Sequence, residues 1–379
     1  EIIKEKTGLI IDPYFSATKL EYLLSQKSIM EKAKRCEILF GTVDSWIIYN
    51  LTGNHFTDVS NASRTMLFNI NKVKWDEDCM KIFNVPEQIL PEVLPSYGNA
   101  IFGYTKIDSV FKKEIPICSV LGDQQAALFG HKCFKKGDIK STFGTGSFMM
   151  MNTGNIKIES NNNLLSTIFY QSDKNKVFYA LEASIYNAGN VLQWLKEDMG
   201  LIDDYKEIEK IAGRSDYNEN IFFVPAFTGL GAPFWDSDAR GIIIGITRST
   251  NRKDIVKVAI ESLAYRTRDV LIALERDSGT EIKEMRIDGG VSQSNVFCQI
   301  LSDLTGIKIE ASDFKEYTAL GSMYAAGLGF GIWEDHQQIN KYRESKTYIP
   351  KINSNLRGKL YKNWSRAVSR SRDWVLDEK

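Results

Sequence analysis

The sequence has few of the residues from which metal centres and disulfide frameworks are built. Its 379 residues include three histidines and five cysteines, and no two cysteines form a Cys-x-x-Cys pair. An odd cysteine count without that spacing argues against a disulfide framework and against a zinc site. The scattered histidines disfavour a histidine metal site and a Ser-His-Asp triad. Cys118 and Cys298 lie in apolar surroundings, so we predict that both are small core residues.

An excess of charge of either sign is also missing. Lys and Arg together number 48, Asp and Glu together number 48, and no polybasic or polyacidic run occurs. The chain therefore lacks the electrostatic features typical of proteins that bind nucleic acid or an anionic membrane surface. No apolar run reaches the roughly 18 residues that a transmembrane helix needs. We expect neither nucleic acid nor membrane as a partner.

The length of the chain is sufficient for two domains with substantial cores. The chain begins with Glu1 rather than Met, and no signal peptide precedes its first motif. We interpret it as an N-terminally incomplete polypeptide from a reducing compartment, the cytoplasm.

Predicted strands and helices alternate along most of the chain, which favours an α/β fold. Strands are predicted at 115–121, on both sides of the Gly-Thr-Gly turn within 140–152, and at 179–184, 221–225 and 285–288. Helices are predicted at 21–36, within 38–51 after a strand edge, and at 251–276 and 292–305. The stretch 52–109 is predicted to be rich in loops. The stretch 317–330 is rich in Ala and Gly, so it can pack closely against a neighbour.

Three polar residues, Asp123, Gln124 and Gln125, lie between two apolar segments. In an open α/β sheet, ligands bind beyond the carboxyl ends of the strands. There, Asp123 could accept the proton of a substrate hydroxyl, and the Gln124 amide could hold a second hydroxyl. Asp is also a favoured helix N-cap, and the segment alone favours that interpretation. Both roles can coexist, because a helix N-terminus keeps a carboxylate ionised.

The Gly-Thr-Gly run within 143–148 is a second candidate. Glycines on both sides of Thr145 permit a tight turn and let backbone N–H groups approach an anion. The alternative is an ordinary hairpin turn. No Gly-x-x-x-x-Gly-Lys-[Ser/Thr] phosphate loop occurs in the sequence.

The Gly-Gly pair that follows Asp288 is a third candidate. Without side chains, Gly289 and Gly290 would let a flat ring such as adenine lie on the backbone. The alternative is an ordinary strand–helix connection. Gly189 and Gln193 could form the opposite wall of such a pocket, although Gln193 also fits an exposed helix position.

Together these features suit phosphoryl transfer better than any one of them does alone. That reaction depends on positioning and charge stabilisation rather than on covalent steps by the enzyme. It requires a base for the acceptor hydroxyl, amide groups for the phosphates, and a platform for the nucleotide.

The sequence resembles the FGGY family of carbohydrate kinases, and within it the glycerol kinases. The matching segments are DPYFSATK (12–19), TDVSNASRT (57–65), GDQQA (122–126), TFGTGSF (142–148), GAPFWD (231–236), ARG (239–241) and DGG (288–290). They follow the family order and cover essentially the whole chain. The resemblance implies two ribonuclease-H-like domains of the actin and hexokinase type, with Mg-ATP and glycerol in the cleft between them. Residues 1–128 would belong to the first domain, incomplete at its N-terminus, and 129–379 to the second.

The resemblance also implies roles for individual residues. Asp123 corresponds to the general base, Tyr14 and Gln124 to glycerol contacts, and Phe148 to the apolar wall beside the carbon chain. The residues that correspond to nucleotide contacts are Thr145, Gly189, Gln193, Gly290 and Ser294, with Asn295 as the alternative to Ser294. The implied reaction forms sn-glycerol 3-phosphate from glycerol and ATP. Two alternatives are a kinase of another small polyol or sugar, and a non-catalytic actin-like nucleotide-binding protein.

Besides the uncertain match at Ser294 and Asn295, the sequence departs from the family pattern in two respects. The N-terminal part of the family sequence, with an Asp for magnesium and an Arg-Glu pair for glycerol, has no counterpart here. We therefore expect this chain by itself to be inactive. The stretch 102–108 does not resemble the glycine-rich fructose-bisphosphate loop of some bacterial enzymes, so inhibition by that effector is not expected. Homo-oligomerisation stays open.

Overall fold

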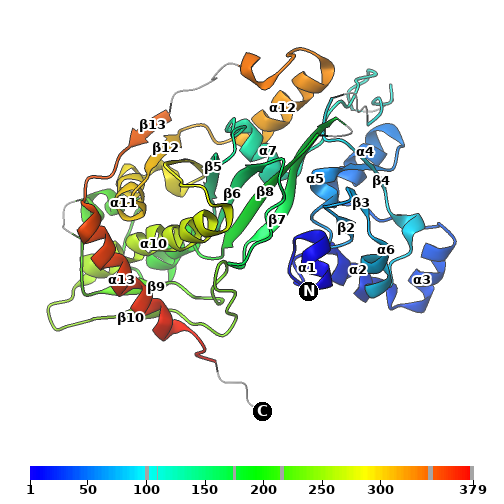
Figure 1. Cartoon of the computed structure of the whole chain (residues 1–379). Helices are drawn as coiled ribbons and strands as arrows, with labels where there is room; N and C mark the ends of the chain where they lie inside the picture. The colour runs from blue at the N-terminus through cyan, green and yellow to red at the C-terminus, as the bar shows by residue number, and fades with distance from the viewer. Residues whose placement is uncertain (99–101, 109, 174–175, 214–216, 340–344, 376–379) are drawn as a thin grey trace.

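The computed structural model describes residues 1–98, 102–108, 110–173, 176–213, 217–339 and 345–375. Figure 1 shows a large twisted sheet with helices on both faces, and beside it a smaller, mainly helical N-terminal region. No helix in the described ranges is both long enough and apolar enough to cross a membrane.

The N-terminal region consists of short elements. These are the helices α1 (Ile2–Thr7), α2 (Ser16–Leu24), α3 (Lys27–Lys34), α4 (Val43–Thr52), α5 (Val59–Ala62), α6 (Glu77–Ile82) and η1 (Glu87–Ile89), and the strands β1 (Phe56–Asp58), β2 (Phe68–Asn69), β3 (Lys74–Trp75) and β4 (Glu92–Leu94). Strands β1 and β4 pair in parallel, and β2 and β3 pair antiparallel. The prediction of one helix over 21–36 is wrong, because the chain turns between α2 and α3. The stretch predicted as loops contains these two small sheets.

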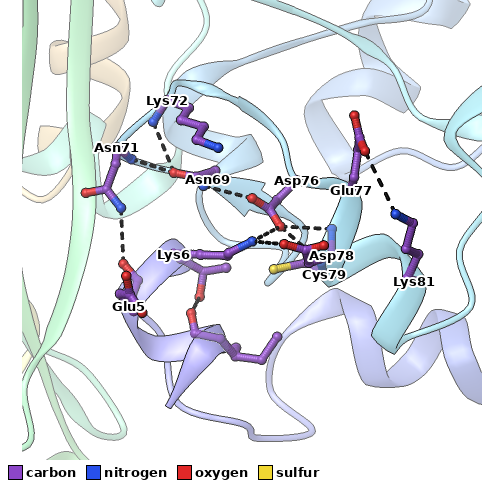
Figure 2. A network of polar contacts seen from close by, with 12 residues as sticks. Glu5, Lys6, Asn69, Asn71, Lys72, Asp76, Glu77, Asp78, Cys79 and Lys81 are labelled. Atoms are coloured by element: carbon purple, nitrogen blue, oxygen red, sulfur yellow. Dashed lines mark hydrogen bonds and ion pairs between the residues drawn. The ribbon is translucent and has the colours of Figure 1, made fainter.

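A polar network around Asp76 joins α1, β2 and α6 (Figure 2). The Asp76 side chain caps α6 by accepting from the backbone N–H of Cys79 at 3.1 Å. It also accepts from Lys6 Nζ at 2.9 Å and from Asn69 Nδ2 at 2.8 Å, and Lys6 contacts Asp78 as well. Burial opposes ionisation of Asp76, yet the Asn69 and Lys6 bonds hold its pKa below the usual range.

The large sheet has the strand order β13-β12-β11-β5-β6-β8-β7. Its members are β5 (Ile139–Phe143), β6 (Ser147–Gly154), β7 (Leu165–Asp173), β8 (Lys176–Ile185), β11 (Glu284–Asp288), β12 (Lys308–Ser312) and β13 (Ser345–Tyr348). Strand β11 pairs in parallel with both β5 and β12, and the other pairs are antiparallel. The hairpin predicted around Gly-Thr-Gly is confirmed as β5–β6. The strand predicted at 221–225 is β9 (Phe222–Val224), which pairs with β10 (Ile242–Ile244) outside this sheet.

Alternation along the strands separates the two faces of the sheet. Met149 and Met151 point into the core formed with α10 and α11, whereas Met150 points into the cluster formed with α7 and α12. The helices of this part are α7 (Asp123–Gly130), α8 (Gly189–Gln193), η2 (Trp194–Asp198), α9 (Lys206–Ala212), α10 (Arg252–Ser278), η3 (Val291–Gln293), α11 (Asn295–Thr305), α12 (Tyr317–Phe330), η4 (His336–Gln338) and α13 (Ser354–Ser371). The helices predicted at 251–276 and 292–305 are α10 and α11. Helix α10 begins at a capping box formed by Asn251 and Asp254.

The close packing predicted for 317–330 is confirmed between α12 and α7. A Cβ added at Gly321 would lie 1.8 Å from the carbonyl oxygen of Ala126, so only glycine fits there. Cys118 and Cys298 are buried, as predicted, and all five cysteines are free.

The buried strand predicted at 115–121 is wrong. This segment makes one isolated bridge, between Tyr104 and Pro116, and backbone hydrogen bonds from Ile117 to Gly103 and from Thr105 to Ile115. Ile115 is exposed and Pro116, Ile117, Ser119 and Val120 are only partly buried. Apolar composition suggested a core strand, but the segment is a mostly half-buried connection into α7 that pairs with no strand of the large sheet.

Helix α10 also buries a carboxyl group, Glu261, whose two oxygens have no hydrogen-bond partner. Lys257 lies one turn away, with its Nζ 3.8 Å from a Glu261 oxygen. Burial raises the pKa of Glu261 to about 8. The folded protein therefore keeps a proton on Glu261 that the unfolded chain releases near pH 4.

We predict that this proton makes stability fall as pH rises. A carboxyl whose pKa is raised by folding contributes fully below its unfolded value and loses that contribution towards its folded value. Between pH 5 and pH 8, ionisation of Glu261 should lower the free energy of unfolding of the wild-type protein by on the order of 2–4 kcal/mol. Glu261→Gln should abolish this decrease. Urea denaturation at both pH values measures it, with the exposed Glu281→Gln as the control. Equal pH dependence in wild type and Glu261→Gln would contradict the prediction.

Candidate active site

A cavity of about 480 Å³ opens between the N-terminal region and the large sheet. Its lining consists of Ile10, Asp12, Tyr14 and Phe15 from the N-terminal region, and Thr145, Gly146, Phe148, Leu165, Ser184, Ile185, Tyr186, Thr228 and Trp235 from the rest of the chain. Three of the residues predicted from sequence, Tyr14, Thr145 and Phe148, therefore meet at one cavity although more than half of the lining was not predicted.

Strand register sets which side chains reach this cavity. Phe148 on β6 pairs with Thr142 on β5 and with Ser184 on β8, so the three side chains share one face of the sheet. Two residues further along β5 and β8, Lys140 and Glu182 flank Met150 on that same face. Two adjacent rows of side chains on this face therefore each carry two polar residues: Thr142 and Ser184 in one row, Lys140 and Glu182 in the next.

Asp123 is the first residue of α7, and its side chain is exposed. The N-cap residue is Gly122, and Asp123 makes no capping bond, so the N-cap interpretation is wrong. The Asp123 carboxylate instead accepts from the Gln124 backbone N–H at 2.8 Å and from Gln124 Nε2 at 3.3 Å. Neither residue lines the cavity itself. Asp123 nevertheless lies near enough to Tyr14 to act on it electrostatically.

The Arg64–Glu182 ion pair joins the two parts of the chain beside Tyr14. Arg64 Nη2 lies 2.8 Å from Glu182 Oε1, and the Arg64 guanidinium lies 5.4 Å from the centre of the Phe15 ring. Burial raises the pKa of Tyr14, and the Arg64 charge opposes that rise. The Arg64 role was not predicted, although the residue lies in the quoted run 57–65.

Lys140 lies on the sheet face below Gln124 and is fully buried. Its Nζ donates to Gln124 Oε1 at 2.5 Å and to Thr142 Oγ1 at 3.1 Å. Neither Lys140 nor Glu182 was predicted from sequence. The sequence could have indicated them, because each is a charged residue at a strand position whose side chain faces the protein interior.

The Gly-Thr-Gly turn is bound to the start of α8. The Gly144 carbonyl accepts from Gly189 N–H at 2.9 Å, and the Thr145 carbonyl accepts from the N–H groups of Ala188 and Asn190 at 3.0 and 3.2 Å. A Cβ added at Gly189 would lie 2.5 Å from the Gly144 oxygen. This close approach brings Thr145 and Gly189 together, as two predicted nucleotide contacts require.

The Gly-Gly turn after β11 lies against the end of β5. Gly289 has φ +95°, and a Cβ there would lie 2.3 Å from the Phe143 carbonyl oxygen. Around Gly290 no atom lies within 4 Å of an added Cβ, so its outer side is open. The Asp288 carboxylate lies 2.9 Å from His131 Nε2 in the interior. The turn therefore exposes Gly290 next to the hairpin that carries Thr145.

The remaining predicted nucleotide residues lie outside the cavity. Gln193 is exposed and donates to Glu197 at 2.7 Å. Ser294 caps α11 and donates to Glu209 at 2.5 Å, while the exposed Asn295 accepts from the Tyr348 hydroxyl at 2.7 Å.

The described ranges contain no group of three or more His, Cys, Asp and Glu residues that could hold a metal ion. A fixed all-protein metal site is therefore not found in these parts of the chain.

Comparisons with known proteins agree with this architecture. Residues 1–130 match the N-terminal domain of the FGGY family of carbohydrate kinases, and residues 139–330 match its C-terminal domain. The chain is 47% identical to the glycerol kinase of Pseudothermotoga lettingae over 379 residues, covering 99% of this chain and 75% of that protein. It is 45% identical to the glycerol kinase of Haloarcula marismortui over 390 residues, covering 100% and 76%.

Solved structures show the same fold. The crystal structure of Plasmodium falciparum glycerol kinase with ADP matches at a TM-score of 0.92 and 38% identity, covering 98% of this chain and 74% of that one. Gluconate kinase from Lactobacillus acidophilus matches at a TM-score of 0.86 and 21% identity, covering 97% and 74%, which shows the fold alone. The predicted fold class, two domains of the actin and hexokinase type, is confirmed. This chain belongs to the FGGY family of carbohydrate kinases.

Proposed function

We propose that this protein transfers the terminal phosphoryl group of ATP to glycerol and forms sn-glycerol 3-phosphate. The observation that carries the proposal is the cavity between the two parts of the chain, where Tyr14 and Phe148 meet Thr145 of the Gly-Thr-Gly turn. The glycerol kinases that are 45 to 47% identical to the chain support glycerol as the acceptor.

On the acceptor side, Asp123 acts as the general base. Its exposed carboxylate takes the proton of the glycerol hydroxyl while that oxygen bonds to the terminal phosphorus of ATP and ADP departs. Gln124 holds a second hydroxyl, and Tyr14 and Phe148 bound the carbon chain. Residues 1–128 supply the acceptor side and 129–379 the nucleotide side in this proposal.

On the nucleotide side, Thr145 and the backbone around it bind phosphate oxygens. Gly189 and the open side of Gly290 provide room for the rest of the nucleotide. Gln193 and either Ser294 or Asn295 make the remaining contacts with the nucleotide in this proposal. Mg²⁺ is expected to accompany ATP, because Mg²⁺ is commonly held by substrate phosphates and water with few protein ligands. When bound, the metal would neutralise phosphate charge.

The two alternatives are less well supported. A non-catalytic actin-like nucleotide-binding protein needs no exposed carboxylate such as Asp123 beside the cavity. A kinase of another small polyol or sugar shares the fold, as the gluconate kinase match illustrates, and only a comparison of acceptors separates it from a glycerol kinase.

Replacing Asp123 tests the general base. In the full-length protein, Asp123→Asn should lower kcat for glycerol phosphorylation by about 10²- to 10⁴-fold. The melting temperature should change little, because an Asn oxygen can still accept the Gln124 N–H bond. Steady-state kinetics and a thermal melt measure the two effects, with the exposed Asp313→Asn as the control. Wild-type turnover in Asp123→Asn would exclude the base role.

A panel of acceptors at fixed Mg-ATP tests the substrate. We expect kcat/KM for glycerol to exceed that for xylulose and gluconate, since a pocket that pairs its polar groups can discriminate by up to roughly 10⁴- to 10⁵-fold. Phe148→Ala should reduce activity with glycerol more than activity with the larger acceptors, because the variant opens the apolar wall. Phe330→Ala, exposed at the end of α12, is the control. A pentulose that outperforms glycerol would reject glycerol as the substrate.

A further inference from the structure

Lys140 is a cationic residue that folding removes from solvent. It lies in the middle of β5 with 0% of its surface exposed. Burying an ammonium group costs free energy unless partners compensate. Burial lowers the pKa of Lys140, and the carboxylates of Asp288, Glu182 and Asp123 oppose that shift. A hydrophobic residue at this position would avoid the cost, so the retained charge calls for a function.

The hydrogen bonds of Lys140 lead directly to the proposed base. An ammonium group can only donate, so it fixes which end of the Gln124 amide faces it, namely Oε1 at 2.5 Å. The amide Nε2 is then directed towards Asp123 Oδ2, 3.3 Å away. With Lys140 absent, the Gln124 amide would be free to rotate, and its orientation towards Asp123 and a substrate hydroxyl would be lost.

The charges around Lys140 come from several elements. Glu182 on β8 is paired with Arg64, and Asp288 on β11 is paired with His131. Asp123 at the start of α7 interacts electrostatically with both Lys140 and Tyr14. Two further groups nearby are the buried thiol of Cys133 and the guanidinium of Arg286, which sits beside Lys140 in the β5–β11 register.

We propose that Lys140 is a positioning residue of the phosphoryl-transfer site, which holds the Gln124 amide in the orientation that directs its Nε2 towards Asp123. This inference rests on the proposed function. Lys140 acts on the acceptor side through its hydrogen bond to Gln124.

Lys140→Met in the full-length protein tests the inference, because Met fills similar volume without charge or donors. Loss of a hydrogen bond to a charged group should lower kcat with glycerol by about 10- to 100-fold. KM for glycerol should rise, while KM for ATP changes less.

A double-mutant cycle with Gln124→Leu separates positioning from general destabilisation. If Lys140 acts through Gln124, then Lys140→Met should lower kcat much less in the Gln124→Leu background than in wild type. Lys257→Met is the matched control, since Lys257 is also buried, but on α10 and 3.8 Å from the Glu261 side chain. It should affect the melting temperature, and its effect on kcat should be the same in the Gln124→Leu background as in wild type.

Each outcome decides the inference. If Lys140→Met does not fold, Lys140→Gln still offers a donor to Gln124, so it should retain more of the wild-type kcat than Gln124→Leu does. A kcat no higher than that of Gln124→Leu would overturn the inference. An unchanged kcat and an unchanged KM for glycerol in folded Lys140→Met would overturn the inference, and the proposed function would stand if wild type phosphorylates glycerol. If wild type prefers another acceptor, glycerol is rejected and the same comparison with that acceptor still tests Lys140. If wild type phosphorylates none, both fall.

Discussion

The antiparallel register of β5, β6 and β8 is the constraint on which the site depends. It places Lys140, Met150 and Glu182 in one row across the sheet, and Thr142, Phe148 and Ser184 in the next. Side chains alternate between faces with period two, so a slip of one residue would turn every one of these groups to the opposite face. The cavity wall and the charges below it would then be exchanged with the apolar core around α10.

Glycine provides a second constraint, close approach of backbones. Gly189 approaches the Gly144 carbonyl and Gly289 approaches the Phe143 carbonyl at distances that leave no space for a Cβ. These contacts bring the ends of three segments that are distant in sequence around the Gly-Thr-Gly turn. Gly290 has open space instead. Neighbouring glycines in the same turn therefore have different roles, one in packing and one in leaving room for a ligand.

Buried charge is unevenly distributed over the fold. The ion pair of Arg266 with Asp269, whose charged atoms are 2.9 Å apart, lies within α10. Such pairs contribute little net stability, because desolvation offsets their attraction. Lys140 differs because it donates to Gln124, to which the proposal assigns an acceptor hydroxyl, and to Thr142, which pairs with the cavity residue Phe148. A buried cation that donates to polar side chains beside a cavity is suited to fixing the orientation of those side chains.

The sequence by itself determined the local features: the hairpin around Gly-Thr-Gly, the long helix at 251–276 and the family to which the motifs belong. Local turns, caps and apolar periodicity depend on neighbouring residues, so they can be predicted from short segments. The sequence did not determine that 115–121 lies outside the large sheet, because an apolar segment is compatible with either a core strand or an extended connection. Whether Asp123 caps α7 was likewise left open.

Tertiary structure alone decided which distant residues meet. Arg64 and Glu182 are 118 positions apart, and their ion pair exists because the N-terminal region docks beside β8. Lys140 reaches Gln124 because α7 packs over the face of the sheet that the strand register gives to Lys140. Such contacts depend on the register of strands and the packing of helices, which no short segment encodes. The motifs could therefore be located from sequence, whereas the charged groups that support them could not.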